Sequence, residues 1–136
     1  MVKPIVRDTM FLARKSVPAT KEDKQVIEDL MDTLLAHRAE CVGMAANMIG
    51  VNRRIIAVCI GTLQFVMINP RITKKITPFK TEEGCLSLDG VKTTTRYKTI
   101  EVEYLDKDFK KQKQRYNGYL AQIILHEYDH LEGIVI

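Results

Sequence analysis

Residues 118–131 read GYLAQIILHEYDHL, a pattern that predicts the central helix of the fold. Apolar residues occupy most of its helical circumference, and Gly133 follows as a C-terminal cap, so we predict a buried helix over Gly118–Leu131. The same helix carries His126, Glu127, Asp129 and His130. Ionisable residues on a buried helix conflict with the rest of the pattern, and such conflicts are expected at functional sites.

The residues from His126 to His130 form an H-E-x-x-H motif. Positions i and i+4 share one face of a helix, so both imidazoles can bind one metal ion, and Glu127 can act on a bound water as a general base. Histidines also cap helices and fill cores, so the motif alone leaves the metal site a hypothesis. A zinc-like site needs a third protein ligand, which we expect upstream, among the cysteines and the acidic residues.

The three cysteines differ in their surroundings. Cys85 lies in the polar, glycine-containing stretch E-E-G-C-L-S and is the best placed to be the third ligand. Cys59 lies in an apolar β run, so we predict that it belongs to the core. Cys41 precedes a glycine-containing segment and has no partner pattern. Three cysteines without a C-x-x-C pair cannot form a closed set of disulfides.

The rest of the chain predicts one further helix and several antiparallel strands. Apolar residues at helical spacing, with Thr20 and Asp23 as a capping box, predict a helix over Lys21–Glu40. Asn69–Pro70 is expected to end a strand. The predicted strands are Arg54–Ile60, Leu63–Ile68, Thr99–Leu105 and Lys111–Tyr116. The expected fold class is α+β, with antiparallel sheets packed around the buried C-terminal helix and with an N-terminal helix.

Length and composition limit the class of protein. The 136 residues are 46% hydrophobic and 28% charged, which excludes disordered and fibrous classes and fits a single domain over 1–136. No apolar run approaches the roughly 20 residues of a membrane span, so we expect a cytoplasmic protein without a membrane partner. The net charge of +4 comes without an aromatic-interleaved basic motif. We therefore expect no direct DNA binding, while attraction to a polyanionic surface such as the ribosome stays open.

Three segments together resemble the motifs of the peptide deformylase family. They are G-M-A-A at 43–46, E-G-C-L-S at 83–87 and H-E-Y-D-H-L at 126–131, and their order and spacing are similar to those of the family. M-I-N-P at 67–70 lies between the first two, as it does in that family. The resemblance spans nearly the whole chain, and the second and third motifs in this combination are highly specific.

The resemblance implies a metal-dependent enzyme that hydrolyses the N-formyl group from the N-terminal formyl-methionine of nascent polypeptides and releases formate. Its cofactor would be iron(II), with zinc or nickel found in some preparations. The implied metal ligands are Cys85, His126 and His130, and the implied catalytic groups are the Glu127 carboxylate as general base and the backbone N–H of Leu86 as an oxyanion donor.

The resemblance also implies further contacts around this centre. Glu83 and Arg96 would form a supporting pair beside the cysteine, although both could instead be ordinary surface charges. Backbone groups of Val42 and Gly43 would hold the formyl-methionyl peptide as an added strand. Val42 and Ile123 would contribute to an apolar pocket for the methionine side chain.

Departures from the family pattern leave two alternatives open. The first motif of the family is G-x-G-x-A-A-x-Q, and the side chain of its glutamine donates to the oxyanion in the substrate site. In this chain Cys41 stands at the first glycine of that motif and Met48 at the glutamine. Leu125 replaces a third family residue, the glutamine before the first histidine. A thioether cannot donate, so Met48 favours a catalytically weak deformylase-like protein that binds or senses formyl-peptides. An entrance reshaped by Cys41 is compatible with a metal-dependent amidase that acts on another N-acyl amine.

Overall fold

The computed structural model describes residues 1–85 and 88–134 and confirms the α+β class. Its helical segments are α1 (Thr9–Leu12), the 3-10 turn η1 (Lys21–Asp23), α2 (Lys24–Ala36), the 3-10 turn η2 (Ala46–Ile49) and α3 (Gly118–Leu131). Its strands are β1 (Gly43–Ala45), β2 (Ile55–Ile60), β3 (Leu63–Cys85), β4 (Leu88–Leu105) and β5 (Lys111–Asn117). None of the described helices is both long enough and apolar enough to cross a membrane.

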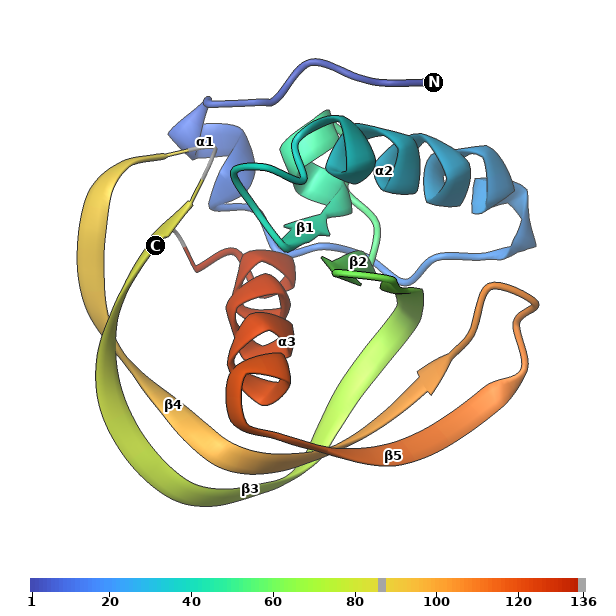
Figure 1. Cartoon of the computed structure of the whole chain (residues 1–136). Helices are drawn as coiled ribbons and strands as arrows, with labels where there is room; N and C mark the ends of the chain where they lie inside the picture. Colours follow the sequence, from blue (N-terminus) through green and yellow to red (C-terminus); the bar gives the residue numbers. More distant parts are fainter. Residues whose placement is uncertain (86–87, 135–136) are drawn as a thin grey trace.

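The strands join in one antiparallel sheet in the order β1-β2-β3-β4-β5. Strand β2 pairs with β3 only up to Ile68, and β5 pairs with β4 only from Thr99 onward. Residues 71–76 of β3 pair with the part of β4 that β5 also covers, and beyond them β3 and β4 pair only with each other among the described strands, over 78–85 and 88–97. We call this two-stranded part the distal ribbon. The long strands and β5 curve around α3, which lies against β1 and β2 at its other end (Figure 1).

Helix α3 has the predicted bounds and ends as its sequence indicates. The N–H of Ile134 donates to the Asp129 carbonyl at 2.9 Å, and that of Gly133 donates to the His130 carbonyl at 3.1 Å. These two bonds form a Schellman motif, with Gly133 at a φ of 75° that favours glycine. Most of the helix is buried, as predicted, but Tyr119 in its first turn is 60% exposed.

The N-terminal helix is shorter than predicted, and its start is confirmed. The Thr20 N–H donates to Asp23 Oδ2 at 2.9 Å, as the capping box requires, and the first turn, η1, is 3-10. Helix α2 ends at Ala36 rather than Glu40 because residues 37–40 offer no apolar side chain to the core. The short helix α1 escaped the sequence reasoning; the Asp8 carboxylate accepts the Met10 N–H at its start.

The prediction that Asn69–Pro70 ends a strand is wrong, because β3 continues through both residues. Asn69 has a φ of 52°, and the register with β4 shifts between Ile68 and Arg71. At such a bulge the missing N–H of proline is tolerated. The Asn69 side chain fixes the bend by accepting the Ala19 N–H at 2.7 Å and donating to the Ala19 carbonyl at 3.0 Å.

One hydrophobic core lies between α2, α3 and the β1–β2 end of the sheet. Its largest fully buried side chains include Leu30, Leu34, Ile56, Met67 and Ile124. Cys59 is 5% exposed within this core, which confirms its predicted place. The packing holds α3 rigidly against β1, and this contact positions the site.

Candidate metal centre and active-site cavity

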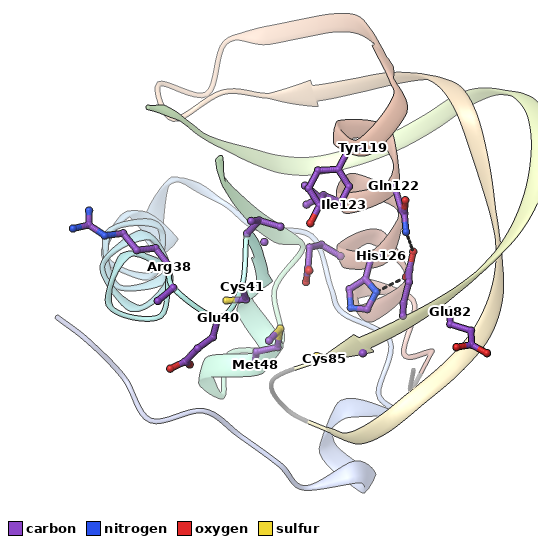
Figure 2. A pocket seen from close by; sticks show the side chains of 16 residues that line it. Arg38, Glu40, Cys41, Met48, Glu82, Cys85, Tyr119, Gln122, Ile123 and His126 are labelled. Carbon is purple, nitrogen blue, oxygen red and sulfur yellow. Dashed lines mark hydrogen bonds and ion pairs between the residues drawn. The ribbon is translucent and has the colours of Figure 1, made fainter. Parts of the chain in front are cut away.

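A cavity of about 630 Å³ opens between the segment before β1, the end of β3 and one face of α3. It brings together predicted site residues that are far apart in the sequence: Val42, Gly43, Met48, Glu83, Cys85, Ile123, His126 and Glu127. In Figure 2, Cys41 and Met48 lie on one side of it and His126 on the other. The predicted oxyanion donor, Leu86, lies outside the described residues.

Three side chains in the site can share one metal ion. The ligand atoms of Cys85, His126 and His130 all lie within 4.8 Å of one another. The cysteine comes from the end of β3, and the histidines from successive turns of α3, as their i, i+4 spacing predicts. The two Nε2 atoms face each other at 3.3 Å, so each ring turns its Nδ1 away from the cluster.

His126 is held by a carboxylate from the sheet. Its Nδ1–H donates to Glu83 Oε1 at 2.6 Å, and the Gln122 amide donates to Glu83 Oε2 at 2.9 Å, as the dashed lines in Figure 2 mark. Burial disfavours a charge on His126, but hydrogen bonds with Cys85 and Glu83 outweigh it and raise the pKa of the imidazole to about 10. A histidine ligand oriented in this way by a carboxylate is typical of metal sites.

Arg96 closes this arrangement into a ring that returns to α3. Its guanidinium donates to both oxygens of Glu83, at 3.0 Å from Nε and 2.7 Å from Nη2, and to Asp129 Oδ2 at 2.7 Å. Arg96 is 3% exposed and Glu83 9%. Burial favours the neutral carboxyl group of Glu83, but the bonds from His126 and Arg96 prevail and lower its pKa to about 2. The ring of His126, Glu83, Arg96 and Asp129 ties α3 to both strands of the distal ribbon.

Glu127 faces the cavity between the histidines and β1. Burial raises the pKa of this carboxyl group to about 7, and its Oε1 has no hydrogen-bond partner among the described residues. A Cβ on Gly43 would lie 3.1 Å from Glu127 Oε2 and 2.8 Å from Ile123 Cγ2. Only glycine at position 43 therefore lets β1 approach α3 this closely, and the approach places an edge strand beside the carboxyl group.

The opposite wall carries the two residues that depart from the family pattern. Met48 is 1% exposed, and its Sδ accepts the Ala45 N–H at 3.4 Å. Burial, followed by the nearby charge of Glu127, raises the pKa of the Cys41 thiol to about 12. Cys41 also accepts a hydrogen bond from the Gly43 backbone N–H, one of the groups expected to hold the substrate.

The other expected peptide contact, Val42, has a different environment. Its carbonyl accepts the Cys59 N–H at 2.8 Å and therefore faces β2. Peptide groups of neighbouring strand residues face opposite sides, so Gly43 presents its own to the free edge of β1. Gly43 is thus better placed than Val42 to pair with an added strand.

His130 lies deeper than His126, and its environment favours the neutral imidazole. It is 0% exposed, and burial, with the charge of His126 as the next cause, lowers its pKa to about 3. Its Nδ1 has no hydrogen-bond partner among the described residues. Sequence reasoning missed three site residues. Asp129 and Gln122 were signalled by polar positions on a buried helix, whereas Asn47, which donates to the His130 carbonyl, had no signal.

Comparison with known proteins agrees with this geometry. The family model for polypeptide deformylases matches residues 2–136. A peptide deformylase of Clostridium beijerinckii is 59% identical over the full length of both chains. The crystal structure of peptide deformylase from Thermotoga maritima covers 99% of this chain and 95% of its own, with a TM-score of 0.88 and 29% identity. A peptide deformylase of Acinetobacter baumannii, with Met-Ala-Ser bound, covers 99% of this chain and 97% of its own, with a TM-score of 0.89 and 26% identity. The chain belongs to the polypeptide deformylase family.

Proposed function

We propose that this chain hydrolyses the N-formyl group from the N-terminal formyl-methionine of nascent polypeptides and releases formate and a free amine. One observation carries the proposal: the potential ligands Cys85, His126 and His130 converge beside Glu127, whose buried Oε1 has no partner. A carboxyl group buried in this way beside an open cavity is typical of a residue that handles a proton during the reaction.

The three ligands fit a divalent metal. One thiolate and two imidazole nitrogens are the donors that iron(II), zinc and nickel accept, and of these we propose iron(II) as the native metal. When bound, such a metal lowers the pKa of water and polarises the formyl oxygen. Glu83 would keep the proton of His126 on Nδ1, which leaves Nε2 free to act as a ligand.

Glu127 would move the proton. A carboxyl group with a pKa near 7 is ionised in about half of the molecules at neutral pH, so it can accept a proton from the attacking water. The same group can then donate that proton to the nitrogen of the breaking C–N bond. The backbone N–H of Leu86 is the proposed donor to the oxyanion.

The edge of β1 would hold the peptide. Gly43 faces this free edge, so a formyl-methionyl peptide can extend the sheet there, with its formamide beside Glu127. Ile123 would contact the methionine side chain, with Val42 beside it in the cavity wall. The relative from Acinetobacter baumannii has the tripeptide Met-Ala-Ser bound, and this is the product that deformylation of formyl-Met-Ala-Ser would give.

The cellular setting of the reaction forms part of the proposal. The substrate class consists of nascent chains, so we place the protein in the cytoplasm, with the exit region of the ribosome as a partner. The net charge of +4 would favour approach to that polyanionic surface. We treat 1–136 as one metallohydrolase domain.

A formate-release assay with iron-loaded, anaerobic protein tests the proposal. Formyl-Met-Ala-Ser should release stoichiometric formate, and acetyl-Met-Ala-Ser, the matched control, should give no product. Cleavage of the acetyl peptide instead would indicate an amidase of different substrate class. Tight binding of formyl-Met-Ala-Ser without formate release would indicate the weak, sensing alternative, which one observation favours: the Met48 sulfur accepts a hydrogen bond and cannot donate one.

A further inference from the structure

The two histidines of the candidate metal centre differ in what holds their outer nitrogen. His126 Nδ1–H donates to Glu83, whereas His130 Nδ1 is buried without a partner among the described residues. A metal on Nε2 of His130 would require the proton to be on Nδ1, and a buried N–H needs an acceptor. The His130 side therefore lacks the partner that the His126 side has.

Asn47 is the described residue best placed to supply an acceptor for His130 Nδ1. Its side chain is 0% exposed, and its Nδ2 donates to the His130 carbonyl at 2.9 Å. Its Oδ1 is buried and, like His130 Nδ1, has no partner within the part of the chain that the structure describes. Oδ1 and Nδ2 are bonded to the same carbon, so the unpaired acceptor lies close to the His130 carbonyl that Nδ2 contacts. A buried polar group without a partner is unfavourable, so each of these two atoms needs one.

We propose that Asn47 positions His130: its Nδ2 holds the His130 backbone, and its Oδ1 accepts the proton of Nδ1 through one buried water. Neither group has a direct hydrogen-bond partner, and one water between them would satisfy both. The inference rests on the proposed function, because it takes His130 as a metal ligand. It assigns to Asn47 the task that Glu83 performs for His126, with a neutral group in place of a carboxylate.

The proposal gives η2 a second role. This turn carries Asn47 and Met48 in succession. The Met48 sulfur stabilises the start of the turn by accepting the Ala45 N–H. The segment that lines the substrate cavity would thus also orient a metal ligand. Changes in Asn47 should therefore alter metal binding, although Asn47 does not touch the metal.

The test measures zinc affinity of the folded, metal-free protein by competition with a chelator. In Asn47→Leu, which has a similar shape but no polar atoms, the dissociation constant should rise about ten-fold or more. In Asn47→Asp, which keeps an oxygen acceptor in either protonation state, most of the affinity should return. Ser16→Ala is the matched control, because it deletes another buried, unpaired oxygen near the same end of α3 and should leave the affinity unchanged.

A second measurement separates positioning from structural support. In zinc-loaded protein labelled with ¹⁵N-histidine, two slowly exchanging Nδ1–H signals are expected, from His126 and His130. Asn47→Leu should remove or broaden the His130 signal and leave that of His126, while thermal unfolding without metal reports the loss of the Asn47–His130 backbone bond separately. Should Asn47→Leu fail to fold, Asn47→Ala, which also has no polar side-chain atom, supplies the same comparison.

Two results would overturn the proposal. One is an Asn47→Leu protein that binds zinc within two-fold of the parent affinity; the other is a His130 Nδ1–H signal that the substitution does not change. Failure of the proposed function would look different, because the unsubstituted protein itself would then bind no stoichiometric zinc through Cys85 and the two histidines.

Discussion

The two walls of the cavity hold their functional groups by different physics. The wall from the distal ribbon is ionic: the buried Glu83 on this wall is bonded to His126 and to Arg96 behind it, and Arg96 is bonded in turn to Asp129 of α3. The wall from residues 41–49 is neutral: the Met48 sulfur can only accept hydrogen bonds, and Cys41 keeps its thiol proton. The ionic wall is suited to fixing the orientation of a metal ligand. The neutral wall determines how tightly the substrate binds and how well the negative charge that develops on it is stabilised.

The largest effect should come from Glu127, which stands between the two walls. Glu127→Ala removes the proton carrier but no metal ligand, so formate release should fall by about 10²–10⁴-fold while the metal content stays stoichiometric. Elemental analysis measures the metal content, and the formate assay measures the activity.

Cys85→Ser is the contrasting variant and should lose the metal to a micromolar chelator while it stays folded. A Cys85→Ser protein with full metal content would contradict the ligand assignment.

A substitution at Glu83 tests how much the ionic wall contributes to stability. The pKa of Glu83 in the folded protein, about 2, is below its ordinary 4.5, so Glu83 contributes stability above about pH 4.5, and this contribution is lost as the pH falls toward 2. In metal-free protein, Glu83→Gln should therefore cost roughly 3 kcal/mol of unfolding free energy at pH 7, and the difference from the parent should shrink in acid. Urea unfolding at several pH values measures it.

The control for this experiment is Glu103→Gln, which breaks an exposed ion pair with Arg71. Exposed pairs contribute little, so the loss should be much smaller than for Glu83→Gln. Equal losses at the two positions would mean that the ionic wall has no special role in stability.

A substitution at Met48 can give the neutral wall a hydrogen-bond donor. A glutamine there could accept the Ala45 N–H with its Oε1, as the sulfur does now, and direct its NH₂ group into the cavity. We expect Met48→Gln to raise kcat/KM about ten-fold, on the order of 1.4 kcal/mol, mostly through kcat, because the donor acts on charge that develops in the transition state. Met48→Leu, which cannot donate, is the matched control and should leave the rate unchanged. A rate for Met48→Gln at or below the parent value would show that another group already fills the oxyanion site.

The smallest effect concerns Cys41. Its sulfur accepts the Gly43 N–H that the peptide would otherwise use, so Cys41→Ala should lower KM by about 2–10-fold, the value of one net hydrogen bond. Cys41→Ser keeps an acceptor and should retain the parent KM. Steady-state kinetics with formyl-Met-Ala-Ser measures both, and an unchanged KM in Cys41→Ala would mean that Gly43 N–H does not bind the substrate.

The sequence predicted the parts of the molecule that local patterns control. The bounds of α3 were predictable because apolar periodicity ends at a glycine that can adopt positive φ. The passage of β3 through Asn69–Pro70 was not, because a bond to Ala19, fifty residues away, stabilises the bend. A rule about proline in strands cannot include such a distant partner.

The same limit applies to the site. Potential metal ligands could be identified because their chemistry and spacing are visible in the sequence. Asp129 lies inside the same motif, yet its partner Arg96 is 33 residues away and on another element. The Asn47 side chain donates to a backbone carbonyl on α3, and a backbone group leaves no mark in the sequence.

The bend at Asn69 has a mechanical consequence. Because β3 leaves β2 at this bend and β5 pairs with β4 only from Thr99 onward, the distal ribbon has no third strand, so Cys85, at the end of β3, sits on an arm that is anchored mainly by side chains. A metal bound by Cys85 and the helix histidines would fasten this arm to α3 and close a loop of about forty residues, much as a disulfide closes a loop in an unfolded chain. Metal binding would thus act as a reversible cross-link between this arm and α3. Amide protons of the arm should therefore exchange with solvent more slowly in the metal-loaded protein than in the metal-free one.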